Sequence, residues 1–260
     1  RHTWVRLPAP NSTVRKAVSG RMKQRMLMRA KQADVIITSS GRVQEDGHRG
    51  FVEWLAYHGL EGSVVENRPL PPFADEKKPP KNGWTVGYIG RVRDIRSFEL
   101  LVEAVKTIPA FERPKLRVAG DGTAASKVRT LLMSEVEAGT IEAEVSGAFS
   151  QSELPELLQS VDVMYAMYSP QRGNVLQGAL PVKVFDAASG GVPSVVNAGC
   201  LRADVVVSEN IGAHAPWGDA ESVGQALRSL RDTVAELAAT GEREHQRWLS
   251  AMNPVLEVLQ

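Results

Sequence analysis

Residues 181–196 read Pro181-Val-Lys-Val-Phe-Asp-Ala-Ala-Ser-Gly-Gly-Val-Pro-Ser-Val-Val196, and this stretch decides the fold. It predicts a short helix that opens at Pro181 and ends at the Gly-Gly pair, followed by a buried strand over 193–196. Lys183 and Asp186 are three positions apart, so they share one face near the helix N-terminus. A cation, a carboxylate and free helix N–H groups together predict a site for a phosphorylated sugar.

Strands and helices alternate on both sides of this unit. We expect strands over 33–40, 62–65, 84–89, 116–119, 141–146 and 161–167, and helices over 12–32, 41–59, 98–108, 154–158, 223–237 and from about 124. Repeated βα units of this kind predict an α/β protein with a Rossmann-like, doubly wound parallel sheet that binds ligands at the carboxyl ends of its strands.

One segment, residues 68–83, contains five prolines and a cluster of charges, and it is typical of a linker. We therefore expect the last part of one Rossmann-like domain over 1–72, a linker over 73–82, a ligand-binding domain over 83–245 and a closing helix over 246–260. The chain begins without an initiating Met, so we expect further strands of the first domain to precede it.

Basic and glycine residues follow two of the expected strands. Arg91 and Arg96 come after 84–89, and guanidinium groups suit a diphosphate because they donate paired hydrogen bonds and keep their charge. Gly120, Gly122 and Ala125 follow the next strand and fit Gly-x-Gly-x-x-Ala, a dinucleotide-binding pattern. That pattern predicts a first βα unit with an acidic residue closing the second strand, and neither feature is present.

Taken in order, these segments resemble retaining glycosyltransferases of family 4, which have the GT-B fold. Residues 181–196 resemble the Pro-x-Lys-x-x-Glu…Gly-x-Pro signature, 90–97 resemble Gly-Arg-x-x-x-x-Lys-Gly, and 118–122 resemble Val-x-Gly-x-Gly. The run Val145-Ser-Gly-Ala-Phe149 resembles the part that surrounds the nucleobase. The resemblance implies two Rossmann-like domains that face a cleft, with the nucleotide-sugar donor in the C-terminal one.

The resemblance assigns roles to individual residues. It implies that cationic side chains neutralise the departing diphosphate, namely Arg91, Arg96 and Lys183. It implies that the remaining donor contacts come from Gly90, Gly120, Gly122, Val145, Gly147 and Asp186. Asp186 stands where the family has a Glu that binds the ribose diol, Arg96 replaces a Lys with Arg93 as a rival, and Ser97 replaces a Gly.

One family residue is absent, because the first acidic residue of the signature would fall on Gly178. Arg172 and Asn174 are candidate substitutes in the preceding loop. The family also has an acceptor-side His, for which His2 is a candidate and a frayed terminal residue the alternative.

The resemblance implies retaining transfer of a sugar from a nucleotide-sugar donor to a glycan or lipid-linked acceptor, as in polysaccharide biosynthesis. Two alternatives stay open: a GT-B nucleotide-sugar epimerase, and a non-catalytic nucleotide-sugar-binding module. The sequence contains no Asp-x-Asp and no paired His/Cys spacing, so we expect no metal and no cofactor.

The composition narrows the partners and the compartment. The net charge is only +1, so the overall electrostatic field of the chain does not favour binding of nucleic acid, which is a polyanion. Cys200 is the only cysteine, so a disulfide framework is excluded and a cytoplasmic location fits. The segment from Arg1 to Gln32 carries nine basic residues and no acidic one. Such a helix suits an anionic membrane surface, here the inner face, and a solvated charged face is the alternative.

Overall fold

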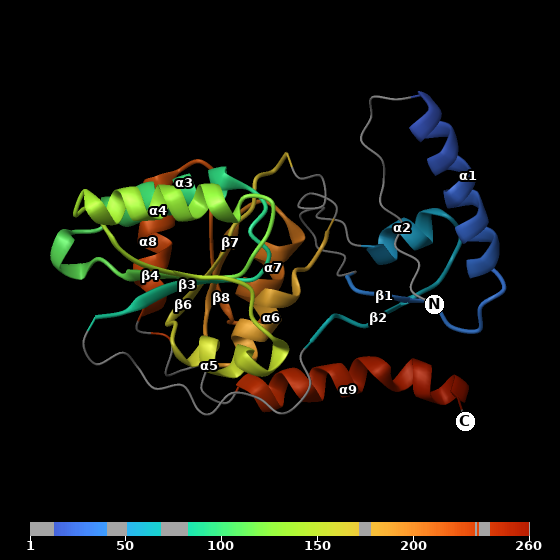
Figure 1. Cartoon of the computed structure of the whole chain (residues 1–260). Helices are drawn as coiled ribbons and strands as arrows, with labels where there is room; N and C mark the ends of the chain where they lie inside the picture. Colours follow the sequence, from blue (N-terminus) through green and yellow to red (C-terminus); the bar gives the residue numbers. More distant parts are fainter. Residues whose placement is uncertain are drawn as a thin grey trace.

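The computed structural model describes residues 13–40, 51–68, 83–171, 178–231, 233 and 240–259. Its larger part is built on a six-stranded sheet of order β5-β4-β3-β6-β7-β8, in which all neighbours run parallel (Figure 1). The strands are β3 (Thr85–Ile89), β4 (Lys115–Ala119), β5 (Glu142–Ser146), β6 (Val163–Ala166), β7 (Ser194–Asn197) and β8 (Gly212–Ala215). The expected α/β class with a doubly wound parallel sheet is confirmed.

Helices cover both faces of this sheet. Successive residues of β6 point to opposite faces, so Tyr165 joins one buried cluster while Met164 and Ala166 join two others. The cluster around Tyr165 includes side chains of α3 (Ile95–Thr107), α4 (Ala125–Glu137) and α8 (Ala220–Leu230). The opposite face is covered by α5 (Leu154–Gln159), α6 (Val182–Ser189) and α7 (Leu201–Ser208). Short 3-10 turns lie at Ala110–Glu112 and Gln151–Glu153.

The N-terminal part is smaller. It contains α1 (Thr13–Ala30), β1 (Ile37–Thr38), α2 (Phe51–Tyr57) and β2 (Ser63–Val64), and the two strands pair in parallel. The last helix, α9 (Thr240–Leu259), lies against both α6 and β2, and Figure 1 shows it running from the large sheet to the small one. The C-terminal helix therefore contacts both parts of the chain.

Several boundaries differ from the sequence predictions. The strand expected over 33–40 is only two residues long, because Ile37 and Thr38 alone pair with β2. The last helix begins at Thr240, inside the range expected for the ligand-binding domain. Helix α7 and strand β8 were not predicted. Several predictions fall outside the described residues, namely the linker over 73–82, residues 41–50 of the helix expected over 41–59, and the candidates His2, Arg172 and Asn174.

Candidate functional site

Loops after β3, β4 and β5 lie side by side at the carboxyl edge of the sheet. Backbone hydrogen bonds join them, since Gly90 N donates to Ala119 O at 2.9 Å and Gly120 N donates to Gly147 O at 2.9 Å. Further along, Val92 N donates to Asp121 O at 2.8 Å. These bonds continue the register of the strands beyond their ends, so the backbone of the three loops is held in fixed positions at the site.

Gly120 and Gly122 are required by this contact between loops. A Cβ on Gly120 would lie 1.9 Å from Gly90 O, and one on Gly122 would lie 2.2 Å from Val92 O. Both glycines also have φ values, 145° and 149°, that other residues rarely adopt. The resemblance implies donor contacts at both glycines, and the structure shows in addition that the neighbouring loop leaves no room for a Cβ at either position.

Helix α6 brings Lys183 to the end of β3. The Lys183 ammonium lies 3.4 Å from the centre of the Tyr88 ring and 5.6 Å from that of Tyr168. A Cβ on Gly90 would lie 3.5 Å from Lys183 Nζ, so the side chain passes directly over the loop that follows β3. Aromatic faces attract a cation, and they hold this one at the carboxyl edge of the sheet.

A cavity of about 200 Å³ lies beside this lysine. It is lined by Ile89, Gly90, Phe149, Gln151, Leu154, Leu158, Met164, Lys183 and Asp186. The structure thus brings together three predicted residues, Gly90, Lys183 and Asp186, from β3 and α6. Apolar and aromatic walls with a few convergent charged groups are typical of small-molecule sites.

The Asp186 carboxyl group is half-buried in this cavity. Burial raises its pKa to about 6, and the nearby Lys183 cation opposes part of that rise. At neutral pH the group is mainly ionised, so a carboxylate and an ammonium face one cavity. Such a pair can accept hydroxyl hydrogen bonds and neutralise an anionic ligand within the same small volume.

Arg91 and Arg96 do not line this cavity, and they stand in the loop after β3 and at the start of α3. Arg91 is exposed and pairs with Asp121, Nη1 to Oδ1, at 2.7 Å. Arg96 stands at the start of α3, where Asp94 accepts from its backbone N at 3.2 Å. Its guanidinium group donates to Gln171 Oε1 at 2.8 Å and to Ser169 Oγ at 3.1 Å, across to the loop after β6. These contacts place both cations at the carboxyl edge of the sheet.

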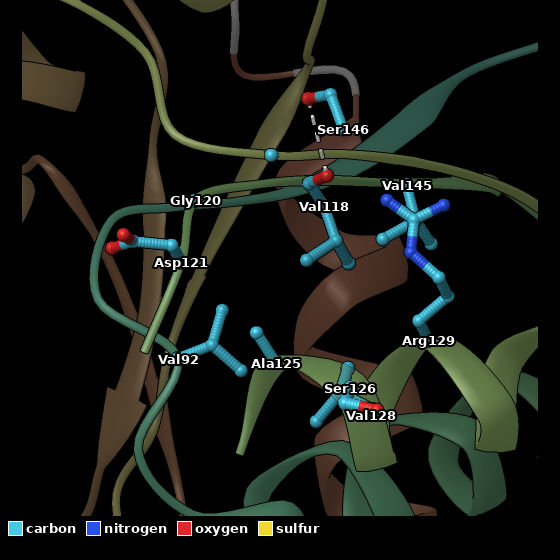
Figure 2. A pocket seen from close by; sticks show the side chains of 11 residues that line it. Val92, Val118, Gly120, Asp121, Ala125, Ser126, Val128, Arg129, Val145 and Ser146 are labelled. Atoms are coloured by element: carbon cyan, nitrogen blue, oxygen red, sulfur yellow. Dashed lines mark hydrogen bonds between the residues drawn. The ribbon is translucent and has the colours of Figure 1, made fainter. Parts of the chain in front are cut away.

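A second cavity of about 120 Å³ lies between α4 and the loops after β4 and β5, and it shares no lining residue with the first (Figure 2). Gly120, Val145 and Gly147 line it together with Arg129, whose side chain reaches toward Val145 in Figure 2. The structure therefore separates these three predicted donor contacts from the cavity of Lys183 and Asp186. Gly122 lines neither cavity.

A family model described as glycosyl transferases group 1 matches residues 83–233. The chain belongs to this family. The matched range contains the whole six-stranded sheet and both cavities, so the site just described lies within the part of the chain that the family model covers. A comparison with curated proteins finds no match for the chain.

Solved structures with the same fold are GT-B glycosyltransferases. HepE from Anabaena in complex with UDP-glucose is 15% identical, with a TM-score of 0.64 over 95% of this chain and 68% of HepE. The lipopolysaccharide outer core galactosyltransferase WaaB is 15% identical, with a TM-score of 0.57 over 88% of this chain and 63% of WaaB. TarM from S. aureus, solved with UDP, is 14% identical, with a TM-score of 0.57 over 91% and 46%. The GT-B fold is confirmed, and the chain spans about half to two thirds of these proteins.

Sequence reasoning on this group 1 glycosyl transferase missed part of the cavity wall. Phe149, Gln151 and Leu154 line the cavity, whereas the resemblance implied donor contacts at Val145 and Gly147, which stand four and two residues before Phe149. Phe149 ends the same quoted run, and an aromatic residue after a strand end is the signal that could have found it. Among the described residues, no group of three or more His, Cys, Asp or Glu side chains is placed to hold a metal ion.

Proposed function

We propose that this chain binds a nucleotide-sugar donor in the Lys183–Asp186 cavity and serves a retaining glycosyl transfer. One observation carries the proposal: a cation and a carboxylate from α6 face one cavity at the carboxyl edge of a sheet that matches the family over 83–233. HepE and TarM were solved with UDP-glucose and UDP, which makes a uridine diphosphate sugar the donor to test first.

In the proposed reaction the bond between the anomeric carbon and a diphosphate oxygen breaks. A bond from that carbon to an acceptor hydroxyl oxygen forms with the same anomeric configuration, and the proton of that hydroxyl passes to an oxygen of the departing diphosphate and then to solvent. The diphosphate leaves with additional negative charge, which Arg91, Arg96 and Lys183 would stabilise through fixed positive charges. Asp186 would accept hydrogen bonds from the ribose hydroxyls, and the aromatic wall at Phe149 would face the base.

Thermal shift with a panel of nucleoside diphosphates tests donor binding and identifies the base. We expect one diphosphate to raise the melting temperature while its nucleoside does not. Incubation of the longest natural chain with the matching nucleotide sugar then separates the activities, because transfer consumes acceptor, epimerisation changes the sugar alone, and a binding module does neither. Absence of a shift with every diphosphate would contradict the proposal.

The acceptor is proposed to be a glycan or a lipid-linked saccharide, with α1 resting on an anionic cytoplasmic membrane face. Arg21, Arg25 and Arg29 are exposed on α1, and Met22 and Met28 leave 52% and 62% of their surface in solvent. Each cation near an anionic surface contributes about 1 kcal/mol. None of the helices within the described ranges has the length and apolar character needed to span a bilayer.

Co-sedimentation with vesicles at low salt tests this membrane contact. We expect binding only when acidic lipid is present, and loss of that binding in the double variant Arg21→Gln/Arg25→Gln. The double variant Lys127→Gln/Arg129→Gln removes the same charge from the surface of α4 and should bind like the wild type. Equal losses in both variants, or no dependence on acidic lipid, would leave α1 as a solvated face.

A further inference from the structure

A cluster of four charged side chains, three buried and one partly exposed, joins the two parts of the chain. Arg68 follows β2, and its side chain is 3% exposed. Its guanidinium group pairs with both Glu209 oxygens, at 3.0 Å for Nη1–Oε2 and 2.8 Å for Nη2–Oε1. Its Nε also donates to Glu66 Oε2 at 3.0 Å. Glu209 ends α7 and is paired in addition with Arg247 of α9.

The same guanidinium group also touches the helix that carries the donor cavity. Arg68 Cζ lies 4.4 Å from the centre of the Phe185 ring on α6. Phe185 stands between Lys183 and Asp186 in sequence, and its side chain is buried in the core cluster of α6 and α7. A helix turns by about 100° per residue, so the Phe185 side chain points away from the face that lines the cavity. The Arg68–Phe185 contact therefore supports α6 on the face opposite to the one that lines the cavity.

The chemistry of this contact requires arginine. A guanidinium group is planar, so it can fork onto a carboxylate in its plane while its face stacks on an aromatic ring. A lysine would keep the charge but could neither donate paired hydrogen bonds to the carboxylate nor stack a planar group on the aromatic ring. Buried charges also need their partners, because one left unpaired is costly, and the partners here come from β2, α7 and α9.

We propose that Arg68 is a positioning residue for the donor site. Through Phe185 it fixes the rotation of α6 and thereby the placement of Lys183 and Asp186. Glu209 pairs both with Arg68, which belongs to the N-terminal part, and with Arg247 of α9. The packing of the N-terminal part against α6 is therefore coupled to donor affinity. This inference rests on the proposed function for its affinity readout, and on geometry alone for the ordering of α6.

A double-mutant cycle on UDP affinity tests the route through Phe185. We expect Arg68→Lys and Phe185→Leu each to weaken UDP binding roughly tenfold, and the double variant to bind no more weakly than Phe185→Leu alone. Arg228→Lys is the matched control, since Arg228 forms a 2.6 Å pair with Glu112 on the surface at 48% exposure. This control should bind UDP like the wild type.

Hydrogen exchange of the α6 amides provides a second readout that does not depend on the ligand. We expect faster exchange over 183–189 in Arg68→Lys and in Phe185→Leu, and no change there in Arg228→Lys. Additive losses in the cycle, or unchanged α6 exchange in both variants, would overturn the inference.

A wild type that binds no nucleoside diphosphate would contradict the proposed function alone, and the exchange result would then decide the role of Arg68. If Arg68→Lys does not fold, the test rests on Phe185→Leu. This variant removes the aromatic ring that Arg68 contacts and keeps every ion pair of the cluster. In that case, unchanged UDP affinity together with unchanged α6 exchange in Phe185→Leu would overturn the inference.

Discussion

Replacing Asp186 by Asn should stabilise the ligand-free protein and weaken its binding of a ribonucleotide. Burial raises the pKa of Asp186 from the ordinary value of 3.8 to about 6, with Lys183 opposing part of the rise. At about 1.36 kcal/mol for each pH unit, the ionised carboxylate costs the folded state up to roughly 3 kcal/mol. An amide of the same size cannot ionise, so the variant should recover up to that amount above pH 6.

The pH dependence has a definite sign. Below pH 3.8 the carboxyl group is neutral in both the folded and the unfolded state, so the substitution should bring no gain there. As pH rises from 3.8 to about 6, only the unfolded chain gives up the proton readily, and the stability that the neutral group provides is lost. The advantage of Asp186→Asn should therefore grow across this window and become constant above it.

Urea unfolding at several pH values measures this difference, with Glu144→Gln as the control. The pKa of Glu144 is lowered, first by its hydrogen bond with Lys115 and also by Arg117. That variant should lose stability above the ordinary value of 4.5, by less than about 1 kcal/mol because the pair is exposed. An Asp186→Asn variant that is destabilised at neutral pH would refute the reasoning, as would equal weakening for ribonucleotides and 2′,3′-dideoxy analogues.

Three further predictions concern the loops at the carboxyl edge. Arg91→Ala should weaken diphosphate binding by about 1.5–3 kcal/mol and leave nucleoside binding unchanged, and equal losses in calorimetry would exclude a diphosphate contact. Gly120→Ala should destabilise the protein by at least about 2 kcal/mol, because its Cβ would lie 1.9 Å from Gly90 O at a φ of 145°. Gly147→Ala, whose Cβ meets nothing within 4 Å, should unfold like the wild type, and similar melting of the two variants would contradict the loop contact. Diphosphate binding should persist in EDTA, since the proposed site relies on cationic side chains, and affinity that collapses on chelation would contradict this.

The sequence allowed most of the central sheet to be predicted because its strands are apolar or alternate apolar with polar residues, and because its turns contain glycine. It failed at β8, where Gly212-Ala-His-Ala215 has low strand propensity and pairs only because β7 is beside it. It also failed at α7, because the run of three valines in Leu201–Ser208 is more typical of a strand. In both places the tertiary context overrides local preference.

The candidate site was predictable only in part, for the same reason. The spacing of Lys183 and Asp186 places them on one helix face whatever the surroundings, and they line one cavity. The assignment of Val145 and Gly147 depended on which side of the β5 loop faces that cavity, which local sequence does not determine. The contact of Arg68 with Glu209 joins residues 141 positions apart, so no local sequence pattern could predict it.

Isothermal titration of UDP into the wild type and into Lys183→Gln measures whether Lys183 faces the diphosphate of the donor in the cavity beside Asp186. We expect measurable binding to the wild type and a loss of about 1.5–3 kcal/mol, or roughly ten- to a hundredfold, in the variant. Equal UDP affinity for the two folded proteins would contradict this role of Lys183.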